Sequence, residues 1–265
     1  MYLNPNWRIL TVGDGDLSFS YALATDIKPT KLVASTYDDA TTLTTKYADN
    51  ALTALKASNV TVLNSFDVTN PETWQRLNGE LFDLVIFQFP LIPAFVGHTA
   101  FRENTVSINT LNRALLHQFI KYATDFALDK NGPMLCYITS KDVKPYREWN
   151  IEGSLNDSLA SRYLGQMPFD IGLFPGYKIR NVDRDKHVKD TSGISYVFSP
   201  NEVPELKDKL TIPAYLGNHS CPLCRVGPFH AAEDKQKHLL AKKHQQMLAF
   251  EADWQTWLAQ FNHQE

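Results

Sequence analysis

Apolar runs recur along the first half of the chain, with amphipathic segments between them. Five short runs predict buried strands, at residues 9–12, 31–37, 60–66, 82–89 and 134–139. Segments 18–24, 40–56, 72–79 and 106–128 predict helices from their apolar spacing, and Asn70-Pro71 supplies a start signal for the third. Strands that alternate with helices favour a parallel sheet covered on both faces. The pattern therefore indicates an α/β fold with a doubly wound sheet.

The pattern changes after residue 139. Residues 152–164 predict a helix, and residues 169–175 and 196–198 predict two further strands. The stretch between these strands, GYKIRNVDRDKHVKD, holds five Lys or Arg against three Asp and is either a solvated hairpin or a nucleic-acid contact. Prolines at 200, 204 and 213 indicate a linker. We therefore expect a main domain at residues 1–200, a linker at 201–216 and a small second unit at 217–265.

Composition narrows the class of protein. The chain has 265 residues, 43% of them hydrophobic, and a net charge of −3, so any contact with nucleic acid must come from local patches. Eighteen consecutive apolar residues do not occur, and the first residues lack a charged region followed by an apolar core, so neither a membrane span nor a signal peptide is expected. Three cysteines do not form a disulfide framework, which favours a cytoplasmic location.

The first apolar run leads into a glycine-rich turn, RILTVGDGDLSFSYA. Gly13 and Gly15 alternate with Asp14 and Asp16, and a helix is expected to start directly afterwards. A strand, a glycine-rich turn and a helix form the nucleotide-binding corner of doubly wound sheets. We expect positive φ angles at both glycines, which allow a ligand to approach the backbone closely. An ordinary structural turn is the alternative, because Gly-x-Gly is common.

The ends of the later strands narrow the choice of nucleotide. Asp38 follows the second strand, about 25 residues after Gly13, where a carboxylate can accept hydrogen bonds from both ribose hydroxyls in NAD and S-adenosylmethionine sites alike. Ser18 stands where the dinucleotide fingerprint has its third glycine, which favours S-adenosylmethionine. Asp67 follows the third strand and is expected either to read the adenine amino group or to cap a turn before Asn70.

The fourth strand ends in Gln88-Phe89-Pro90, a polar, aromatic and proline sequence. In order, GDGDLSFSYALA, ASTYDD, DVT, FDLVIFQFP, YREWNIEG and FPGYKIR resemble the Rossmann-like methyltransferases related to the fungal ribosomal-RNA uridine-N3 methyltransferase, over residues 7–198. The resemblance implies a class I methyltransferase fold, S-adenosylmethionine as methyl donor and a base in RNA as acceptor. The family usually has asparagine at Gln88 and histidine at Leu91, so the ring atom that accepts the methyl group stays open.

The resemblance also implies roles for individual residues. Donor binding is expected at Gly13, Asp14, Gly15, Asp16, Ser18, Asp38 and Asp67. Catalytic roles are expected at Gln88, Phe89 and Pro90, where the amide reads a base edge and the ring stacks on the base. Candidates for proton handling are His98, Lys141 and Asp142. Tyr146, Trp149 and Asn150 either build the base pocket or pack the loop after the fifth strand.

The last 49 or so residues contain a pattern of metal-ligand type. Its members are Cys221, Cys224, His238 and His244, in the spacing C-x2-C-x13-H-x5-H. Two thiols and two imidazoles suit tetrahedral zinc in a closed structural site. The pattern resembles the zinc fingers of the matrin and spliceosomal type, which are common in RNA-associated proteins. His219 and His230 are substitute ligands, and a reduced cysteine turn with solvated histidines is the alternative.

These features favour an RNA methyltransferase that contacts tRNA or rRNA through the zinc finger and the segment Lys178–Lys189. A methyltransferase with a protein or small-molecule acceptor is one alternative, and a non-catalytic Rossmann and zinc-finger RNA-binding module is another. Beyond the finger, the last helix carries Phe250, Trp254, Trp257 and Phe261 on one face, which we expect to dock on the main domain.

Overall fold

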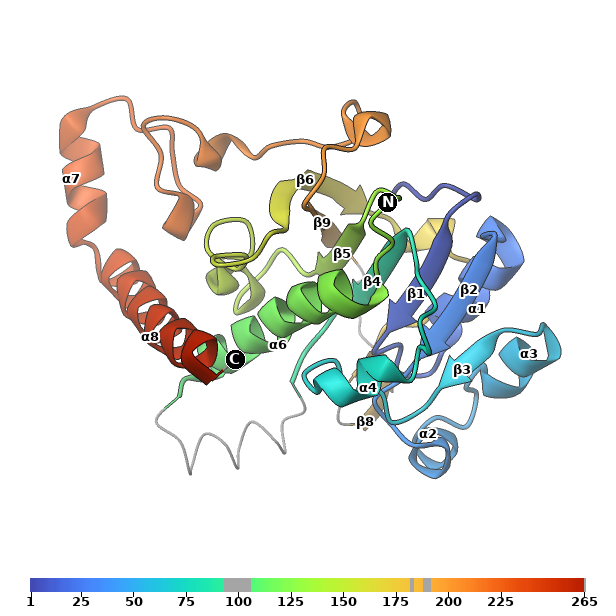
Figure 1. Ribbon diagram of the computed structural model, residues 1–265. Coiled ribbons are helices and arrows are strands. Elements are labelled where there is room, and N and C mark those ends of the chain that lie inside the picture. Colours follow the sequence, from blue (N-terminus) through green and yellow to red (C-terminus); the bar gives the residue numbers. More distant parts are fainter. Residues whose placement is uncertain (93–105, 182–183, 188–191, 265) are drawn as a thin grey trace.

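The computed structural model describes residues 1–92, 106–181, 184–187 and 192–264. A seven-stranded sheet in the order β3-β2-β1-β4-β5-β9-β6 lies at its centre (Figure 1). The strands are β1 (Arg8–Val12), β2 (Lys31–Ser35), β3 (Thr61–Leu63), β4 (Leu84–Gln88), β5 (Leu135–Ser140), β6 (Arg162–Phe169) and β9 (Gly193–Ser199). A second, two-stranded sheet pairs β7 (Arg180–Asn181) with β8 (Arg184–His187).

Five neighbouring strands of the large sheet, β3, β2, β1, β4 and β5, run parallel, as the sequence predicts. Strand β9 departs from this pattern, because it pairs antiparallel with both β5 and β6. The chain returns from β6 to β9 through turns and the β7–β8 hairpin, and an antiparallel pair needs no helical crossover. The fold is thus α/β, with a mixed sheet in which only the β5–β9 and β6–β9 pairs are antiparallel.

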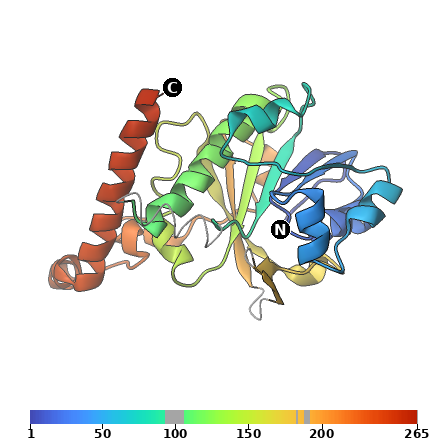
Figure 2. The ribbon, with the colours of Figure 1, turned by 90° about the horizontal axis from the view of Figure 1, so that it is seen from below.

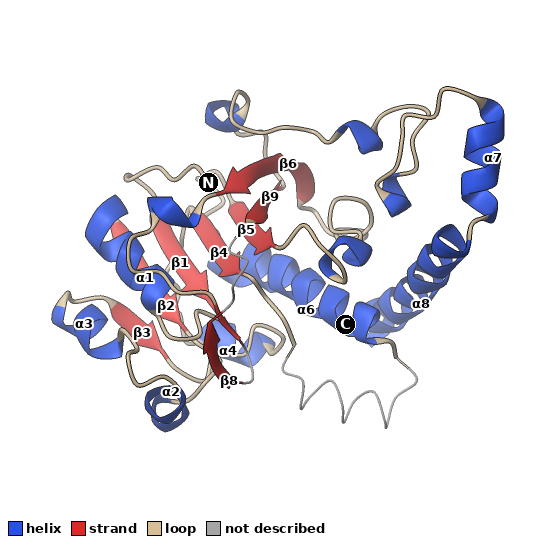
Figure 3. Ribbon diagram, turned by 180° about the vertical axis from the view of Figure 1, so that it is seen from behind, coloured by secondary structure: helices blue, strands red, loops and turns tan. Residues whose placement is uncertain are grey.

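Helices cover both faces of this sheet. They are α1 (Ser18–Ala22), α2 (Ala40–Lys46), α3 (Leu52–Ala57), α4 (Pro71–Gln75) and α6 (Ile108–Tyr122). Two further helices, α7 (Ala232–Leu240) and α8 (Lys242–Gln264), follow in the C-terminal part of the chain, and α7 lies away from the sheet (Figure 1). Ile9 of β1 and Phe19 of α1 belong to one buried cluster, whereas the next residue, Leu10, belongs with Phe119 of α6 to another. Helices α1 and α6 lie on opposite faces of the sheet (Figure 1, Figure 3). Successive strand residues point to opposite faces, so one apolar run supplies two cores.

The helix expected over residues 40–56 is broken into two. Helix α2 ends at Lys46, and α3 begins only at Leu52. Between them, the side chain of Asn50 donates to the carbonyl of Tyr47 at 2.7 Å, and its own oxygen accepts from the N–H of Leu52 at 3.1 Å. An asparagine side chain that forms hydrogen bonds with free backbone groups in this way ends one helix and starts the next. The break buries the Tyr47 ring, which is 1% exposed.

The helix expected over residues 152–164 does not form, and this prediction is wrong. Residues 151–160 form turns, and β6 then begins at Arg162. Asn150 and Ser158 both have left-handed backbone, with φ angles of 47° and 68°, which interrupts a helix at each end. The Asn150 side chain also donates to Ser154 Oγ at 2.9 Å, a local bond that competes with helical hydrogen bonding.

The strand expected over residues 169–175 is also wrong. Strand β6 ends at Phe169, and a 3₁₀ turn, Ile171–Leu173, follows. The carboxylate of Asp170 accepts a hydrogen bond from the N–H of Gly172 at 2.8 Å and so caps this turn. The strand expected at residues 196–198 is present within β9.

The C-terminal helix α8 lies beside α6 (Figure 2). Trp254, Trp257 and Phe261 form a stack whose rings approach the buried His117 of α6, with centroid distances of 5.5, 6.1 and 5.7 Å. The predicted docking face is therefore confirmed for these three aromatic residues. Phe250 packs instead against the buried Cys/His region.

The segment expected as a linker packs along the free edge of β6. Gln166 and Thr211 exchange two backbone hydrogen bonds, of 2.9 and 2.8 Å, and Leu206 is 1% exposed. Residues 201–216 are thus part of the folded body. Among the described residues, no helix combines the length and the apolar character needed to cross a membrane.

Candidate active site

A cavity of about 300 Å³ opens at the carboxyl ends of the parallel strands. The sheet order reverses between β1 and β4, which is the position where doubly wound sheets bind their ligands. The walls of the cavity include the predicted residues Gly13, Asp14, Gly15, Asp38, Asp67, Gln88, Phe89 and Pro90. The structure therefore brings together residues that follow four different strands. Asp16 and Ser18 do not line the cavity, and each holds a neighbouring segment in place.

The glycine turn has the close backbone packing that the sequence predicts, but only one of its glycines needs positive φ. Gly13 has a φ angle of +62°, and a Cβ atom there would lie 2.4 Å from the Phe87 ring. Gly15 does not have positive φ, so that expectation is wrong, and Leu17 takes the left-handed conformation with φ 65°. A Cβ atom on Gly15 would instead lie 3.3 Å from the hydroxyl of Tyr47. The absence of a side chain thus matters at both positions, for different reasons.

Asp14 braces the turn with its side chain. One carboxylate oxygen accepts hydrogen bonds from the backbone N–H of Ser20 at 2.7 Å and from its hydroxyl at 2.6 Å. The Ser20 hydroxyl also lies 2.7 Å from Thr11 Oγ1. Burial, together with the nearby Asp16, raises the pKa of Asp14 to about 7. The carboxylate therefore couples the turn to α1.

Asp16 and Ser18 fasten a distant segment over the cavity. Asp16 Oδ2 lies 2.5 Å from Arg180 Nε, and both side chains are almost fully buried. Ser18 Oγ accepts a hydrogen bond from the backbone N–H of Lys178 at 3.0 Å. Asp49 pairs with both Lys178 and Arg180, which line the cavity. These two cations, at the start of the basic segment, are therefore already paired with acids of the main domain.

The two acids expected to read the nucleoside both face the cavity. Asp38 Oδ2 lies 3.2 Å from Lys46 Nζ on α2. Asp67 Oδ1 accepts hydrogen bonds from the backbone N–H of Thr69 at 2.9 Å and from its hydroxyl at 2.7 Å. The two roles expected of Asp67, capping a turn and facing the nucleotide, are thus compatible, because one of its oxygens caps the turn while the residue also lines the cavity.

The end of β4 combines a buried amide with strained backbone. Gln88 is 8% exposed, and its Oε1 has no hydrogen-bond partner among the described residues. A buried acceptor without a partner lowers stability unless a ligand satisfies it. Phe89 has a φ angle of +47°, its N–H donates to Thr139 at 2.8 Å, and its ring meets Phe169 edge to face at 5.4 Å. Left-handed phenylalanine is strained, and such strain gathers at functional sites.

The candidates for proton handling are not part of the described cavity wall. Asp142 pairs through both oxygens with Arg147, at 2.6 Å each, and with Arg225 at 3.2 Å. The hydrogen bonds from Arg147 lower the pKa of Asp142, which makes it a weak base. Lys141 is absent from the cavity wall, and His98 lies outside the described residues.

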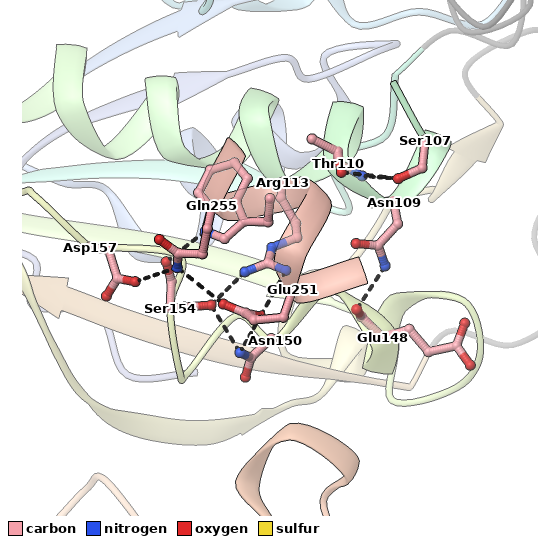
Figure 4. Close-up of polar contacts among 11 residues, drawn as sticks. Ser107, Asn109, Thr110, Arg113, Glu148, Asn150, Ser154, Asp157, Glu251 and Gln255 are labelled. Carbon is pink, nitrogen blue, oxygen red and sulfur yellow. Dashed lines mark hydrogen bonds and ion pairs between the residues drawn. The ribbon is translucent and has the colours of Figure 1, made fainter. Parts of the chain in front are cut away.

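The loop residues after β5 pack the interior and do not line the cavity. Trp149 is 1% exposed within the main core, and Tyr146 meets it edge to face at 4.9 Å. Asn150 donates to Glu251 of α8 at 3.1 Å (Figure 4). Of the two alternatives for these residues, the packing role is the one that the structure shows.

Several cavity residues carry no recognisable sequence signal of their own. They are Thr36, Tyr37, Lys46, Tyr47, Ile92, Leu115, Tyr177 and Ile179. Leu115 belongs to the apolar pattern of α6, and Tyr47 belongs to the break between α2 and α3, so both resemble ordinary core positions. Thr36 and Tyr37 lie within the ASTYDD motif, and Tyr177 and Ile179 lie within FPGYKIR, so these motifs are the available signal for four of the residues. Burial raises the pKa of Tyr177 well above its usual value.

The four predicted metal ligands also come together. The ligand atoms of Cys221, Cys224, His238 and His244 all lie within 4.8 Å of one another. His244 Nδ1 is 3.5 Å from Cys221 Sγ and 3.4 Å from Cys224 Sγ. Bonds of about 2.3 Å to sulfur and 2.05 Å to nitrogen in a tetrahedral zinc site separate S and N by about 3.5 Å. The donor set and its spacing therefore fit zinc.

Two further observations agree with this fit. His238 Nε2 is buried and has no hydrogen-bond partner among the residues that the structure describes. Burial and the neighbouring Cys221 raise the pKa of Cys224 to about 12, so two thiolates here would need a cation between them. The substitute ligands His219 and His230 are not part of the cluster.

Known proteins resemble this chain at several levels. The heavy metal-associated isoprenylated plant protein 41 of Arabidopsis thaliana is 31% identical over 191 residues, which are 69% of this chain and 34% of that protein. The chain thus spans about a third of that relative's length. The M1A22 tRNA methyltransferase TrmK of B. subtilis has a TM-score of 0.42 and 12% identity, covering 96% of this chain and 92% of its own. The ribosomal protein L11 methylase of Lactobacillus delbrueckii subsp. bulgaricus has a TM-score of 0.38 and 13% identity, covering 74% and 71%.

A family model adds the decisive comparison. The BMT5-like family, described as rRNA (uridine-N3-)-methyltransferase BTM5-like, matches residues 10–181, which is more than half of the 265-residue chain. The matched range includes the glycine turn, the cavity-lining Asp38 and Asp67, the end of β4 and the segment that covers the cavity. It ends before the Cys/His cluster begins. The chain therefore belongs to the BMT5-like methyltransferase family.

Proposed function

We propose that the chain methylates a base nitrogen in RNA, namely N3 of uridine in rRNA or tRNA, with S-adenosylmethionine as donor. One observation carries the proposal: the range matched by the family model coincides with the wall of a cavity at the switch point of the sheet. That wall combines acids suited to a nucleoside with the Gln88 side chain, whose amide oxygen has no partner among the described residues and suits a base edge.

The chain's own residues suit the donor. Asp38 would accept hydrogen bonds from the ribose hydroxyls, in place of its present contact with Lys46, and Asp67 would face the adenine. Gly13 and Gly15 would leave room for the donor against the backbone. When bound, the donor supplies an electrophilic methyl group on a sulfonium sulfur.

The acceptor side must hold the base and help it lose a proton. The uracil N–H proton leaves to solvent, a nitrogen–carbon bond forms, and the carbon–sulfur bond breaks with its electron pair retained on sulfur. The amide of Gln88 can donate to a uracil carbonyl and so stabilise the negative charge that develops when the proton leaves. Left-handed backbone at Phe89 turns the chain at this point and presents the amide to the cavity.

The test uses the full chain with methyl-labelled donor and separate samples of rRNA, tRNA and a protein extract. We expect label in RNA, and mass spectrometry of the digested nucleosides should identify 3-methyluridine. Asp38→Asn should abolish donor binding and transfer, whereas the matched control Asp39→Ser, which keeps the cap of α2, should not. Gln88→Ala should reduce transfer while donor binding is retained. Label in protein would favour the alternative acceptor, and donor binding without transfer to any sample would favour a non-catalytic binding module.

We infer that the Cys/His cluster holds one structural zinc ion. Its burial and the spacing of its donors support this inference, and zinc would stabilise a unit too small to build its own core. Reduced cysteines agree with the predicted cytoplasmic location, which stays a prediction. Metal analysis should give one zinc per chain, lost in Cys221→Ser and kept in the matched control Cys136→Ala. A full zinc equivalent in Cys221→Ser would contradict the assignment.

We further infer that the finger contributes to RNA binding through exposed lysines on α7 and α8. They are Lys235, Lys237, Lys242 and Lys243. Each phosphate contact makes binding more sensitive to salt, so Lys235→Gln/Lys237→Gln should lower the slope of log K against log salt by about 2. Lys130 precedes β5 and lies at the end of the strands opposite to the cavity, so Lys130→Gln is the control and should leave the slope unchanged.

A further inference from the structure

We infer that Arg225 is a positioning residue that couples the Cys/His cluster to the acceptor side of the methyltransferase cavity. The inference rests on the proposed function, since it concerns how the acceptor site is held. Arg225 follows Cys224 directly and has left-handed backbone, with a φ angle of 55°. Its side chain leaves the finger and enters the main domain, where it is 7% exposed.

The contacts of Arg225 join three separate parts of the main domain. Its Nη2 donates to Glu152 at 2.7 Å and to the Tyr196 hydroxyl at 2.9 Å, and its Nε lies 2.7 Å from the other Glu152 oxygen. Its Nη1 donates to Asp142 at 3.2 Å. The Nη2 contact is a hydrogen bond and the Nε contact is an ion pair without hydrogen-bond geometry, and together they hold the guanidinium beside the carboxylate at two points.

Asp142 and Glu152 bracket the first half of the connection between β5 and β6, residues 141–152, which is called the loop below. The Glu152 side chain is fully buried, so its charge depends on a cation held beside it. One guanidinium therefore ties both ends of the loop together and fastens them to Tyr196 of β9. The cation comes from the finger, although the loop belongs to the methyltransferase domain.

The loop is connected in turn to the cavity wall. The backbone carbonyl of Glu148 accepts a hydrogen bond from Asn109 Nδ2 of α6 at 2.7 Å (Figure 4). One turn further along α6, Asn112 Oδ1 accepts from the N–H of Ile92 at 3.2 Å. Ile92 lines the cavity two residues after Pro90. Displacement of the loop would thus reach the segment that leaves the acceptor end of β4.

Metal binding and the position of Arg225 are linked by a short turn. Cys221 and Cys224 flank the 3₁₀ turn Pro222–Cys224, which ends at Arg225. Ligation of both cysteines would fix this turn and so fix the direction of the next side chain. Loss of the metal would free the turn, and Glu152 would lose the cation beside it.

Amide hydrogen exchange on the full chain tests this coupling without relying on methyl transfer. The samples are the untreated protein, Arg225→Met, the control Arg147→Met and protein treated with a zinc chelator. Arg147 also pairs with Asp142, but its side chain is 52% exposed and does not reach Glu152. We expect exchange in residues 141–152 to rise at least tenfold in Arg225→Met and after chelation, and less than twofold in Arg147→Met.

The combination of changes gives a sharper result. Chelation of Arg225→Met should raise exchange in the loop no further, because both changes break the same link, whereas additive increases would overturn the inference. Unchanged exchange in Arg225→Met with zinc retained would also overturn it. If Arg225→Met does not fold, Glu152→Gln removes the charge from the other partner and should give the same exchange pattern.

Kinetics then separate positioning from general destabilisation. Arg225→Met should raise KM for RNA about tenfold and leave donor affinity within twofold, and Arg225→Lys should recover part of the loss. Equal losses in donor and RNA affinity would indicate a structural role alone and overturn the inference. If no RNA is methylated by any variant, the proposed function fails, while the exchange experiment still reports on the coupling.

Discussion

Arg113 of α6 and Glu251 of α8 hold the C-terminal helix on the main domain, and Glu251→Gln is the sharpest test of this contact (Figure 4). The two side chains meet at 3.0 Å, and the Arg113 guanidinium also donates to Ser154 and lies 4.6 Å from the Trp254 ring. Arg113 is 1% exposed, whereas the Glu251 side chain is 22% exposed. Burial lowers the pKa of Arg113, which reflects the cost of a charge at this position.

The unequal burial determines the size of the effect. Removing one partner of a buried pair costs about 3–5 kcal/mol, because the remaining charge is left unpaired. Glu251→Gln leaves the fully buried Arg113 charge without a partner of opposite charge but keeps a hydrogen-bond acceptor. We therefore expect the free energy of unfolding to fall by about 3 kcal/mol. At roughly 2–4 °C per kcal/mol, this lowers Tm by about 6–12 °C. Arg113→Met leaves Glu251 without its partner, but Glu251 is partly solvated, so we expect the free energy of unfolding to fall by only about 1–2 kcal/mol.

Urea and thermal unfolding of the two single variants and the double variant measure these values. The double variant should be more stable than Glu251→Gln, because no buried charge is left without a partner. If Arg113→Met proves more destabilising than Glu251→Gln, the reasoning is refuted, and packing of Arg113 on Trp254 would then outweigh its charge.

Three further predictions concern the donor site. Gly13→Ala should weaken donor binding at least tenfold in calorimetry, whereas Gly79→Ala, with a φ angle of +80° and open space around it, should cost only about 1 kcal/mol of stability and leave binding unchanged. The raised pKa of Asp14 means that the folded state holds a proton that the unfolded state releases above about pH 4. The free energy of unfolding should therefore fall as the pH rises from about 4 to about 7, and urea unfolding of Asp14→Asn should not show this fall. Asp16→Asn should weaken donor binding about tenfold, because the buried Arg180 loses its partner and the segment over the cavity loosens; donor affinity equal to that of the unchanged protein would contradict this role.

The sequence was sufficient to place the main elements of the cavity. Each parallel strand is a continuous apolar run, and each run ends in a residue with recognisable chemistry, such as Gly13, Asp38, Asp67 or Gln88. Parallel strands all end at one edge of the sheet, so residues far apart along the chain must meet there once the fold class is known. Likewise, the Cys and His spacing alone grouped the four cluster residues.

Other features depended on the three-dimensional arrangement. Asp16 meets Arg180 across 164 residues, and Arg113 meets Glu251 across 138. No periodicity or motif predicts such pairs, because in the sequence a charged residue that will be buried looks the same as one that will stay exposed to solvent. The expected helix at 152–164 is a related case, since Asn150, which has left-handed backbone, donates a hydrogen bond to Glu251 of α8, a residue 101 positions away.

The chain's local pattern therefore specified the parallel strands, the glycine turn and the residues that follow these strands, because these depend on near neighbours and on one rule of sheet topology. Tertiary structure alone decided which charges are buried together, and that Arg225, next to the Cys/His cluster, supplies the cation for Glu152 of the main domain. Such partnerships form only when folding removes both groups from water, and the free energy that selects them is absent from any short stretch of sequence.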